Sequence, residues 1–267
     1  MTAGSSGDVW AVGSAYEHYV GRWSRLVARD FLAWLAGPAG RGWLDVGCGT
    51  GAVSQTILER GAPSTVVGID TSAGFVEHAR GAISDPRASF RVGDAQALPF
   101  EDASLDAAVS GLVLNFVRDP ARMVGEMRRV VKPGGVAAIY VWDYAGEMQL
   151  TRYFWNAAAA LDPAARELDE GRRFPLCGAA PLAGLARAAG LAAVETRSLD
   201  VATTFRDFDD YWTPFLGGQG PAPAYCMALS EDRRAALRET LRATLPARPD
   251  GSVALIARAW AVKGRAA

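Results

Sequence analysis

The sequence predicts an open α/β fold, a doubly wound and mostly parallel sheet with helices on both faces. From Arg41 onward, short apolar runs rich in β-branched residues alternate with segments of helical periodicity, the pattern of a parallel sheet flanked by helices. The first run ends in a glycine-rich turn, Gly47-Cys48-Gly49-Thr50-Gly51, as expected where a strand meets a helix at the ligand edge of such a sheet. With 267 residues, half of them hydrophobic, the chain can bury a full core.

The apolar runs predict strands at 43–46, 65–69, 88–92, 105–110 and 136–142. Helices are predicted between them at 52–60, 73–83 and 120–131, and before the first strand at 14–36. The helix at 120–131 has clear ends, because Asp119 is a good N-cap, Pro120 suits the first helical position and Lys132-Pro133-Gly134-Gly135 closes it. Beyond Trp142 the alternation stops, and we expect helices at 147–161, 181–189 and 231–243 and strands at 193–201 and 252–262.

Composition argues against several classes of function. The formal net charge is −1, so no overall positive field would attract a nucleic acid or an anionic membrane. Cys48, Cys177 and Cys226 form no CxxC pair, which argues against a zinc site or a disulfide framework. The N-terminus does not read as a signal peptide, and the apolar run at 136–142 is too short to span a bilayer. We therefore expect a cytoplasmic monomer or homodimer without a metal, nucleic-acid or membrane partner.

The glycine turn is compatible with two kinds of cofactor. Residues from Gly47 to Ala52 fit the GxGxxA pattern of dinucleotide sites, and Asp70 ends the next strand about where a ribose-binding carboxylate is expected. Asp45 precedes the turn and Asp94 follows the third strand, so three carboxylates should meet at one sheet edge. This acidic crevice suits a ligand with a positive charge, a ribose and an exocyclic amine better than a chain of phosphates. A nicotinamide-dependent oxidoreductase is an alternative, although no Tyr-x-x-x-Lys motif supports it.

Four ordered blocks of sequence resemble a known family. They are LDVGCGTG at 44–51, VGIDTS at 67–72, GDAQALPF at 93–100 and EMRRVVKPGG at 126–135. With these blocks the chain resembles class I S-adenosylmethionine-dependent methyltransferases, specifically the ubiquinone and menaquinone biosynthesis group. The resemblance is strong over 16–142 and loose elsewhere. It implies a Rossmann-like sheet of seven strands with an antiparallel C-terminal strand, a helical cap, and S-adenosylmethionine as the methyl donor, with S-adenosylhomocysteine as product.

The resemblance also implies which residues bind the cofactor. Gly47 and Gly49 would let the backbone approach the methionine and ribose parts, with Asp45 near the methionine amino group. Asp70 would accept both ribose hydroxyls, and Asp94 would face the adenine amine. An N-terminal lid would add aromatic contacts, with Tyr19 and Arg22 as further lid candidates. The full expected set is Tyr16, Trp23, Asp45, Gly47, Cys48, Gly49, Thr50, Asp70, Thr71, Ser72, Asp94, Ala95, Gly111 and Leu112.

The residues that meet the methyl acceptor are predicted from their places in the fold. Methyl transfer needs the nucleophile held in line with the sulfonium, and a general base only where the acceptor loses a proton. Asn115 and Asp143 follow the fourth and fifth strands and His18 lies in the expected lid, so these are the candidate catalytic residues. Relatives often carry histidine soon after the fourth strand, whereas Asn115 can orient an acceptor but cannot take its proton. Aromatic residues beyond Trp142 suit a flat or apolar small molecule: Tyr153, Phe154, Trp155, Phe174, Phe208, Tyr211, Trp212, Phe215 and Tyr225.

We expect residues 1–40 to form the N-terminal lid and 41–145 the cofactor-binding core. Segments 146–180 and 205–250 would form a cap that holds the substrate, and 181–204 with 251–267 would complete the core sheet. The preferred function is methyl transfer to an O, N or C atom of a small molecule. Further alternatives are methylation of RNA or protein, and a non-catalytic protein that binds S-adenosylmethionine.

Overall fold

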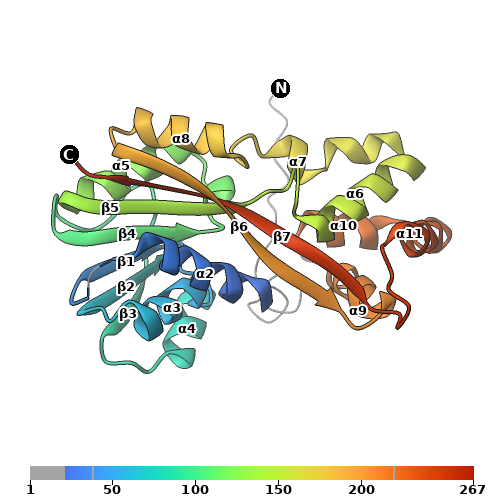
Figure 1. Ribbon diagram of the computed structural model, residues 1–267, viewed down its shortest axis with the longest axis horizontal. Helices are drawn as coiled ribbons and strands as arrows, with labels where there is room; N and C mark the ends of the chain where they lie inside the picture. Colours follow the sequence, from blue (N-terminus) through green and yellow to red (C-terminus); the bar gives the residue numbers. More distant parts are fainter. Residues whose placement is uncertain (1–21, 38, 219) are drawn as a thin grey trace. The chain divides into compact units, whose positions relative to one another are not determined.

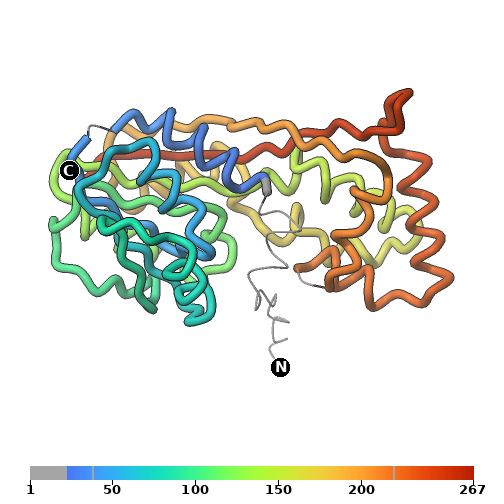
Figure 2. The backbone as a smooth tube through the Cα atoms, turned by 90° about the horizontal axis from the view of Figure 1, so that it is seen from below, coloured from blue at the N-terminus to red at the C-terminus, as the bar shows by residue number. Residues whose placement is uncertain are grey.

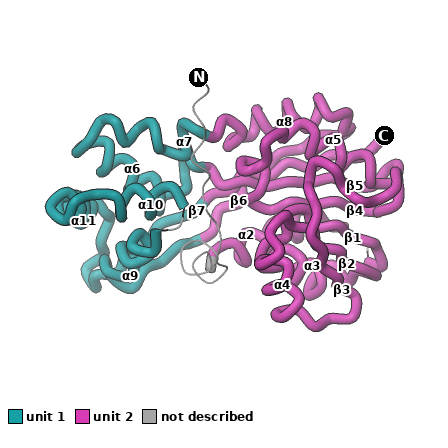
Figure 3. Tube along the Cα trace, turned by 180° about the vertical axis from the view of Figure 1, so that it is seen from behind, with its two compact units in different colours: residues 1–22, 144–173, 202–257 teal, residues 23–143, 174–201, 258–267 magenta. Residues whose placement is uncertain are grey.

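The computed structural model describes residues 22–37, 39–218 and 220–267, without the side chain of Arg22. The chain divides into two compact units, coloured separately in Figure 3. We call one the sheet unit, which spans residues 23–143, 174–201 and 258–267, and the other the helical unit. Apart from Arg22, the described residues of the helical unit are 144–173, 202–218 and 220–257. The assignment of a lid to 1–40 and of a substrate cap to 146–180 and 205–250 stays a prediction.

A seven-stranded mixed sheet organises the fold, in the order β3-β2-β1-β4-β5-β7-β6 (Figure 1). β1 pairs in parallel with β2 and β4, β2 with β3, and β4 with β5, whereas β7 runs antiparallel to β5. The predicted fold class, including the antiparallel C-terminal strand, is therefore confirmed. The strands are β1 (Gly42–Val46), β2 (Thr65–Asp70), β3 (Ala88–Val92), β4 (Leu105–Gly111), β5 (Val131–Trp142), β6 (Ala192–Phe205) and β7 (Val253–Arg265).

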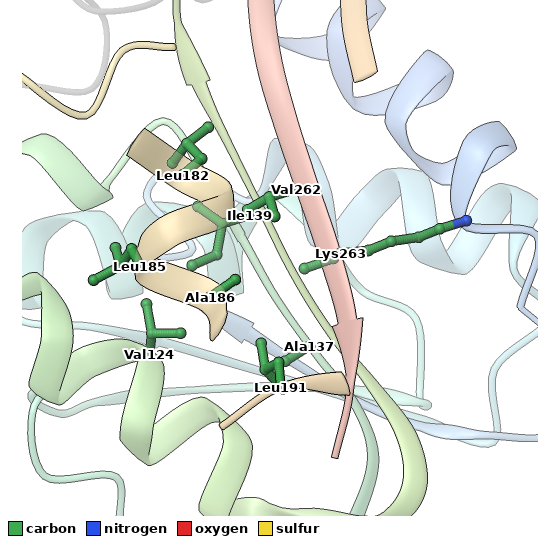
Figure 4. Close-up of a pocket in the computed structure, with 10 residues that line it drawn as sticks. Val124, Ala137, Ile139, Leu182, Leu185, Ala186, Leu191, Val262 and Lys263 are labelled. Carbon is green, nitrogen blue, oxygen red and sulfur yellow. The ribbon is translucent and has the colours of Figure 1, made fainter. Parts of the chain in front are cut away.

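Helices cover both faces of the sheet unit. Side chains of successive strand residues point to opposite faces, and in β5 Tyr140 packs against Phe31 of α2 with ring centroids 4.7 Å apart. Its neighbour Ile139 points instead into a small apolar pocket between β5, α5 and α8, as Figure 4 shows. In the same figure Lys263 of β7 extends away from that pocket, and its Nζ lies over the ring of Trp34 in α2. The helices are α2 (Arg22–Leu35), α3 (Ala52–Arg60), α4 (Ala73–Ala82), η2 (Leu114–Phe116), α5 (Pro120–Val130) and α8 (Ala179–Ala188).

The boundary between α5 and β5 differs from the prediction. Asp119 caps α5 by accepting from the Arg122 N–H at 3.0 Å, as expected, but Lys132-Pro133-Gly134-Gly135 lies inside β5 rather than between helix and strand. The β4–β5 pairing shifts register at this point. A Cβ on Gly135 would lie 2.6 Å from the Asp106 carbonyl oxygen, so glycine lets β5 approach β4 closely enough for the strand to continue.

The helical unit has an aromatic core. Phe154 stacks on Phe215 with centroids 4.5 Å apart, and Tyr211 and Trp212 pack against the same Phe215 ring. Such rings bury large areas, so they hold short helices together. The short helices α7, α9 and α10 were not predicted. The unit contains α6 (Gln149–Leu161), η3 (Pro163–Glu167), α7 (Glu170–Arg173), α9 (Phe208–Trp212), η4 (Thr213–Gly217), α10 (Pro221–Ala228) and α11 (Glu231–Thr244).

The chain order of the strands reverses beside β1. β2 and β3 lie on one side of β1, while β4 and β5 lie on the other, as the labels in Figure 1 show. Figure 2 follows the same chain from blue to red after a 90° turn. In open α/β sheets such a reversal opens a crevice at the carboxyl ends of the strands, where ligands bind. The carboxyl ends of β1 and β4 are therefore where a site is expected. Across residues 22–37, 39–218 and 220–267, none of the helices is both long and apolar enough to cross a membrane.

Candidate functional site

The turn after β1 is shaped by glycines with left-handed backbone. Gly47, Gly49 and Gly51 have φ values of +73°, +51° and +90°, which residues with a Cβ rarely adopt. A Cβ on Gly47 would lie 2.5 Å from Val113, and one on Gly51 would lie 2.7 Å from Ile83, whereas a Cβ on Gly49 would meet nothing within 4 Å. Gly47 and Gly51 therefore allow close packing. Gly49 leaves one face of the turn open.

Asp45, near the end of β1, is a carboxylate with no exposed surface. Its Oδ2 accepts from the Ser54 N–H at 2.9 Å and from the Ser54 hydroxyl at 2.6 Å. Its Oδ1 is buried and has no hydrogen-bond partner among the described residues. Burial raises the pKa of Asp45 from 3.8 to about 7, although the bonds from Ser54 act in the opposite direction. A cationic or N–H-bearing group that reached Oδ1 would supply the missing partner.

Asp70, at the end of β2, ties the glycine turn to the next loop. Its Oδ2 accepts from the Gly49 N–H at 3.0 Å, and its Oδ1 accepts from the Ser72 N–H at 2.9 Å. Ser72 also caps α4 by accepting from the Phe75 N–H, while Thr71 is exposed. Burial raises the pKa of Asp70, and the backbone bonds oppose that rise. The carboxylate is half-buried, so its remaining lone pairs can accept from the hydroxyls of a sugar.

Asp94 follows β3 and is exposed, whereas the adjacent Ala95 is buried. The Asp94 Oδ1 accepts from the backbone N–H of Gln96 at 2.8 Å and from its side-chain Nε2 at 3.2 Å. These bonds from Gln96 lower the pKa of Asp94. The carboxylate is thus held ionised in a tight turn, as a pure acceptor for an amine.

Cys48 and Thr50 are buried members of the glycine turn. The Cys48 side chain packs with Val76, Ala79 and Phe90, its N–H donates to the Ile69 carbonyl at 2.9 Å, and burial raises the pKa of its thiol. Cys48 therefore shapes the turn from inside, and the predicted contact of this residue with a cofactor stays a prediction.

The segment after β4 has an unusual backbone at its first residues. Leu112 has φ +65°, and its N–H donates to the Tyr140 carbonyl at 2.8 Å. A Cβ on Gly111 would lie 2.5 Å from the Tyr140 hydroxyl oxygen. Both residues are half-buried. The chain therefore turns sharply at the carboxyl end of β4, beside the glycine turn that Val113 contacts.

Two candidate catalytic residues lie at the carboxyl ends of β4 and β5. Asn115, half-buried in η2, donates from Nδ2 to the Sγ of Cys177 at 3.1 Å. Asp143, directly after β5, is 7% exposed, and its N–H donates to the Arg258 carbonyl at 2.9 Å. The third candidate, His18, lies outside the described residues, as do Tyr16 and Tyr19. Trp23 is buried in α2.

The aromatic residues expected to line an acceptor pocket are mostly interior. Six of them have exposed fractions of 9% or less and pack on one another within the helical unit: Phe154, Trp155, Phe208, Tyr211, Trp212 and Phe215. Phe174 differs, because it belongs to the sheet unit and meets Phe116 edge to face at 5.5 Å. Phe116 itself is 41% exposed. Phe174 was among the predicted residues, but Phe116 was not, and the signal that could have found it is a large apolar side chain directly after Asn115.

Sequence reasoning also missed side chains that support the carboxylates. Ser54 donates to Asp45, and Gln96 donates to Asp94.

On α5, Glu126 and Arg129 bond to the loop after β3. Glu126 accepts from the Leu98 N–H at 2.8 Å, and Arg129 donates to the Leu98 carbonyl at 3.0 Å. Glu126 and Arg129 stand in the fourth block of the sequence and Leu98 in the third, so the two blocks meet in space.

Comparison with known proteins agrees with this architecture. Residues 44–139 match the family described as a methyltransferase domain. The 2-methyl-6-phytyl-1,4-hydroquinone methyltransferase of Synechocystis sp. is 38% identical over 120 residues, which cover 45% of this chain and 37% of that protein. The 2-phytyl-1,4-naphtoquinone methyltransferase of Nostoc punctiforme is 34% identical over 127 residues, 46% of this chain and 55% of that protein.

A solved structure extends the similarity to nearly the whole fold. A chain of the Haloferax volcanii complex between the Trm112 methyltransferase activator and a methyltransferase superposes with a TM-score of 0.60 at 23% identity, covering 99% of both chains. At that identity the likeness concerns the fold alone. The chain spans 28%, 37% and 46% of the length of the first three curated relatives that it matches.

Proposed function

We propose that residues 44–139, which match a methyltransferase domain, bind S-adenosylmethionine and that the protein transfers a methyl group from it to a small-molecule acceptor. The observation that carries the proposal is the set of three carboxylates around an open glycine turn: Asp45, Asp70 and Asp94. S-adenosylmethionine offers an ammonium, two ribose hydroxyls and an adenine amine, which are donors for these acceptors.

The three carboxylates fit S-adenosylmethionine better than they fit a dinucleotide. The buried Oδ1 of Asp45 has no partner among the described residues, so an ammonium near it would satisfy a carboxylate that is otherwise costly to ionise. Gly49 leaves open space where the methionine and ribose parts would pass. A pyrophosphate in the same place would face like charge from Asp45 and Asp70.

The bound cofactor supplies an electrophilic methyl group on a sulfonium. The chain's own contribution is to hold the acceptor atom in line with that methyl group and to exclude water. We assign this role to Asn115 and Asp143, at the carboxyl ends of β4 and β5. Because Nδ2 of Asn115 is occupied by Cys177, its Oδ1 is the atom that can accept from an O–H or N–H of the acceptor. Asp143 is the carboxylate that can receive the proton where the acceptor loses one.

A flat acceptor is supported by two observations. The named relative from Synechocystis acts on a hydroquinone, and in this chain Phe116 and Phe174 form an edge-to-face pair next to Asn115. A half-exposed ring can pack on an aromatic acceptor. We therefore propose a hydroxylated aromatic compound as the acceptor class.

Calorimetric titration with S-adenosylhomocysteine tests the cofactor assignment. We expect binding by the wild-type protein and a loss of at least tenfold in affinity for Asp70→Ala, since a charged hydrogen-bond acceptor contributes about 1.5–3 kcal/mol. The matched control is Asp85→Ala, which removes a half-buried carboxylate that bonds to Arg87. Absence of binding by the wild-type protein overturns the proposal.

Incubation with labelled S-adenosylmethionine and a panel of phenols and hydroquinones tests the acceptor class. Label in an organic-soluble product supports a small-molecule acceptor. Label found only in added RNA or protein contradicts it and favours the macromolecular alternative. Cofactor binding without any transfer across the panel and the macromolecules favours a non-catalytic binding protein.

A further inference from the structure

Gln96 lies between the carboxylate expected to recognise adenine and the first turn of α5. Its Nε2 lies 3.2 Å from the Asp94 Oδ1, and its Oε1 accepts from the Asp119 N–H at 2.9 Å. Asp119 is the N-cap of α5. Gln96 therefore bridges the loop after β3 to a helix end.

The bonding pattern fixes the orientation of the Gln96 amide. A backbone N–H can only donate and an ionised carboxylate can only accept, so the side chain must present oxygen to Asp119 and nitrogen to Asp94. A third bond locks the main chain, because Nε of Arg122 donates to the Gln96 carbonyl at 2.7 Å. The bridge has one arrangement that satisfies all its groups.

This arrangement engages one carboxylate oxygen of Asp94 more than the other. Oδ1 receives two bonds from Gln96, from N–H at 2.8 Å and from Nε2 at 3.2 Å. Oδ2 has a single longer contact with the same Nε2, at 3.5 Å. Asp94 is exposed, so its Oδ2 keeps lone pairs that can accept from an exocyclic amine.

We propose that Gln96 is a positioning residue for cofactor recognition: it fixes Asp94 so that Oδ2 faces the 6-amino group of adenine. This inference rests on the proposed function. It predicts that the contribution of Gln96 to affinity exists only when the ligand carries that amino group.

The experiment is a cycle of two proteins and two ligands. Wild type and Gln96→Ala are titrated with S-adenosylhomocysteine and with its 6-deamino analogue, in which hydrogen replaces the amino group. We expect Gln96→Ala to bind S-adenosylhomocysteine about tenfold more weakly, as for loss of one charged hydrogen bond, and to bind the analogue within twofold of wild type. In turnover, KM for S-adenosylmethionine should rise while kcat at saturation stays unchanged.

Gln55→Ala is the matched control, because Gln55 also donates to a carboxylate, Glu59 at 2.9 Å, and accepts from an arginine, but it lies on α3. Should Gln96→Ala fail to fold, Gln96→Glu keeps the bond from Asp119 and places a negative oxygen near Asp94, and it should show the same ligand-dependent loss. Equal losses for both ligands, or no loss for S-adenosylhomocysteine, overturn the role of Gln96. A wild-type protein that binds neither ligand overturns the proposed function and this role with it.

Discussion

Replacing Asp45 by asparagine should change how stability depends on pH. In the folded protein the pKa of Asp45 is about 7, compared with 3.8 for an unperturbed carboxyl, because burial opposes its ionisation. Between these two pH values the folded chain keeps a proton that the unfolded chain has released. The folded state therefore binds more protons, and stability falls as pH rises through this window.

The magnitude follows from the two pKa values. Linkage gives a loss of about 3 kcal/mol in the free energy of unfolding between pH 5 and pH 8 from Asp45 alone. For a chain of this size, that corresponds to a fall of about 5–10 °C in Tm. Asparagine has a similar shape and does not ionise, so the free energy of unfolding of Asp45→Asn should lack this pH-dependent loss. Contributions from groups that do not interact with Asp45 are common to both proteins and cancel in the difference.

Thermal unfolding followed by circular dichroism at pH 5, 6, 7 and 8, at constant ionic strength, measures this difference. We expect the advantage of wild type over Asp45→Asn to shrink by about 3 kcal/mol across the series. A difference that does not change with pH would refute the assigned burial of an ionisable Asp45. In a second arm, wild type should bind S-adenosylhomocysteine about fivefold more tightly at pH 7 than at pH 6, since the ligand ammonium favours the ionised carboxylate, and Asp45→Asn should show no such gain.

Three further substitutions test the glycine turn and the acceptor end. Gly49→Ala should weaken S-adenosylhomocysteine binding and lower the free energy of unfolding by about 1–2 kcal/mol, because the φ of Gly49 is +51°. The control Gly81→Ala, in α4 where a Cβ would meet nothing within 4 Å, should stabilise the protein slightly. If calorimetry and unfolding show equal effects for the two variants, Gly49 has no special role in the cofactor site. Gly47→Ala should destabilise further through its 2.5 Å approach to Val113, and Val113→Ala should recover part of the lost Tm if that contact is the cause. Phe116→Ala should raise KM for an aromatic acceptor several-fold with unchanged cofactor affinity, and a change confined to cofactor binding would remove Phe116 from the acceptor site.

The sheet was predictable because its signals are local. β3 and α3 match their predicted bounds at both ends, since apolar runs, glycines and caps act within a few residues. The extension of β5 back to Val131 was not predictable, because it depends on how closely Gly135 lets the strand approach Asp106. That distance belongs to the tertiary structure.

The candidate site was predictable only in part for the same reason. Asp45, Asp70 and Asp94 were proposed because each lies at or next to the end of a strand, and parallel strands bring such positions to one edge. Ser54 and Gln96 act through side-chain contacts, and Gln96 has its partner Asp119 more than twenty residues away in sequence. Among the aromatic residues beyond Trp142, six are buried against one another, and composition alone does not separate such a core from the wall of a pocket.

The attachment of the loop after β3 to α5 has a consequence for local unfolding. Arg122, in the first turn of α5, donates to the Gln96 carbonyl, and Arg129, near the end of α5, donates to the Leu98 and Phe100 carbonyls. Segments joined by such bonds open as one cooperative unit. In hydrogen exchange, the amides of this loop should therefore share the protection of α5 rather than that of β3, to which they are adjacent in sequence, and a ligand at Asp94 should slow exchange along the helix as well.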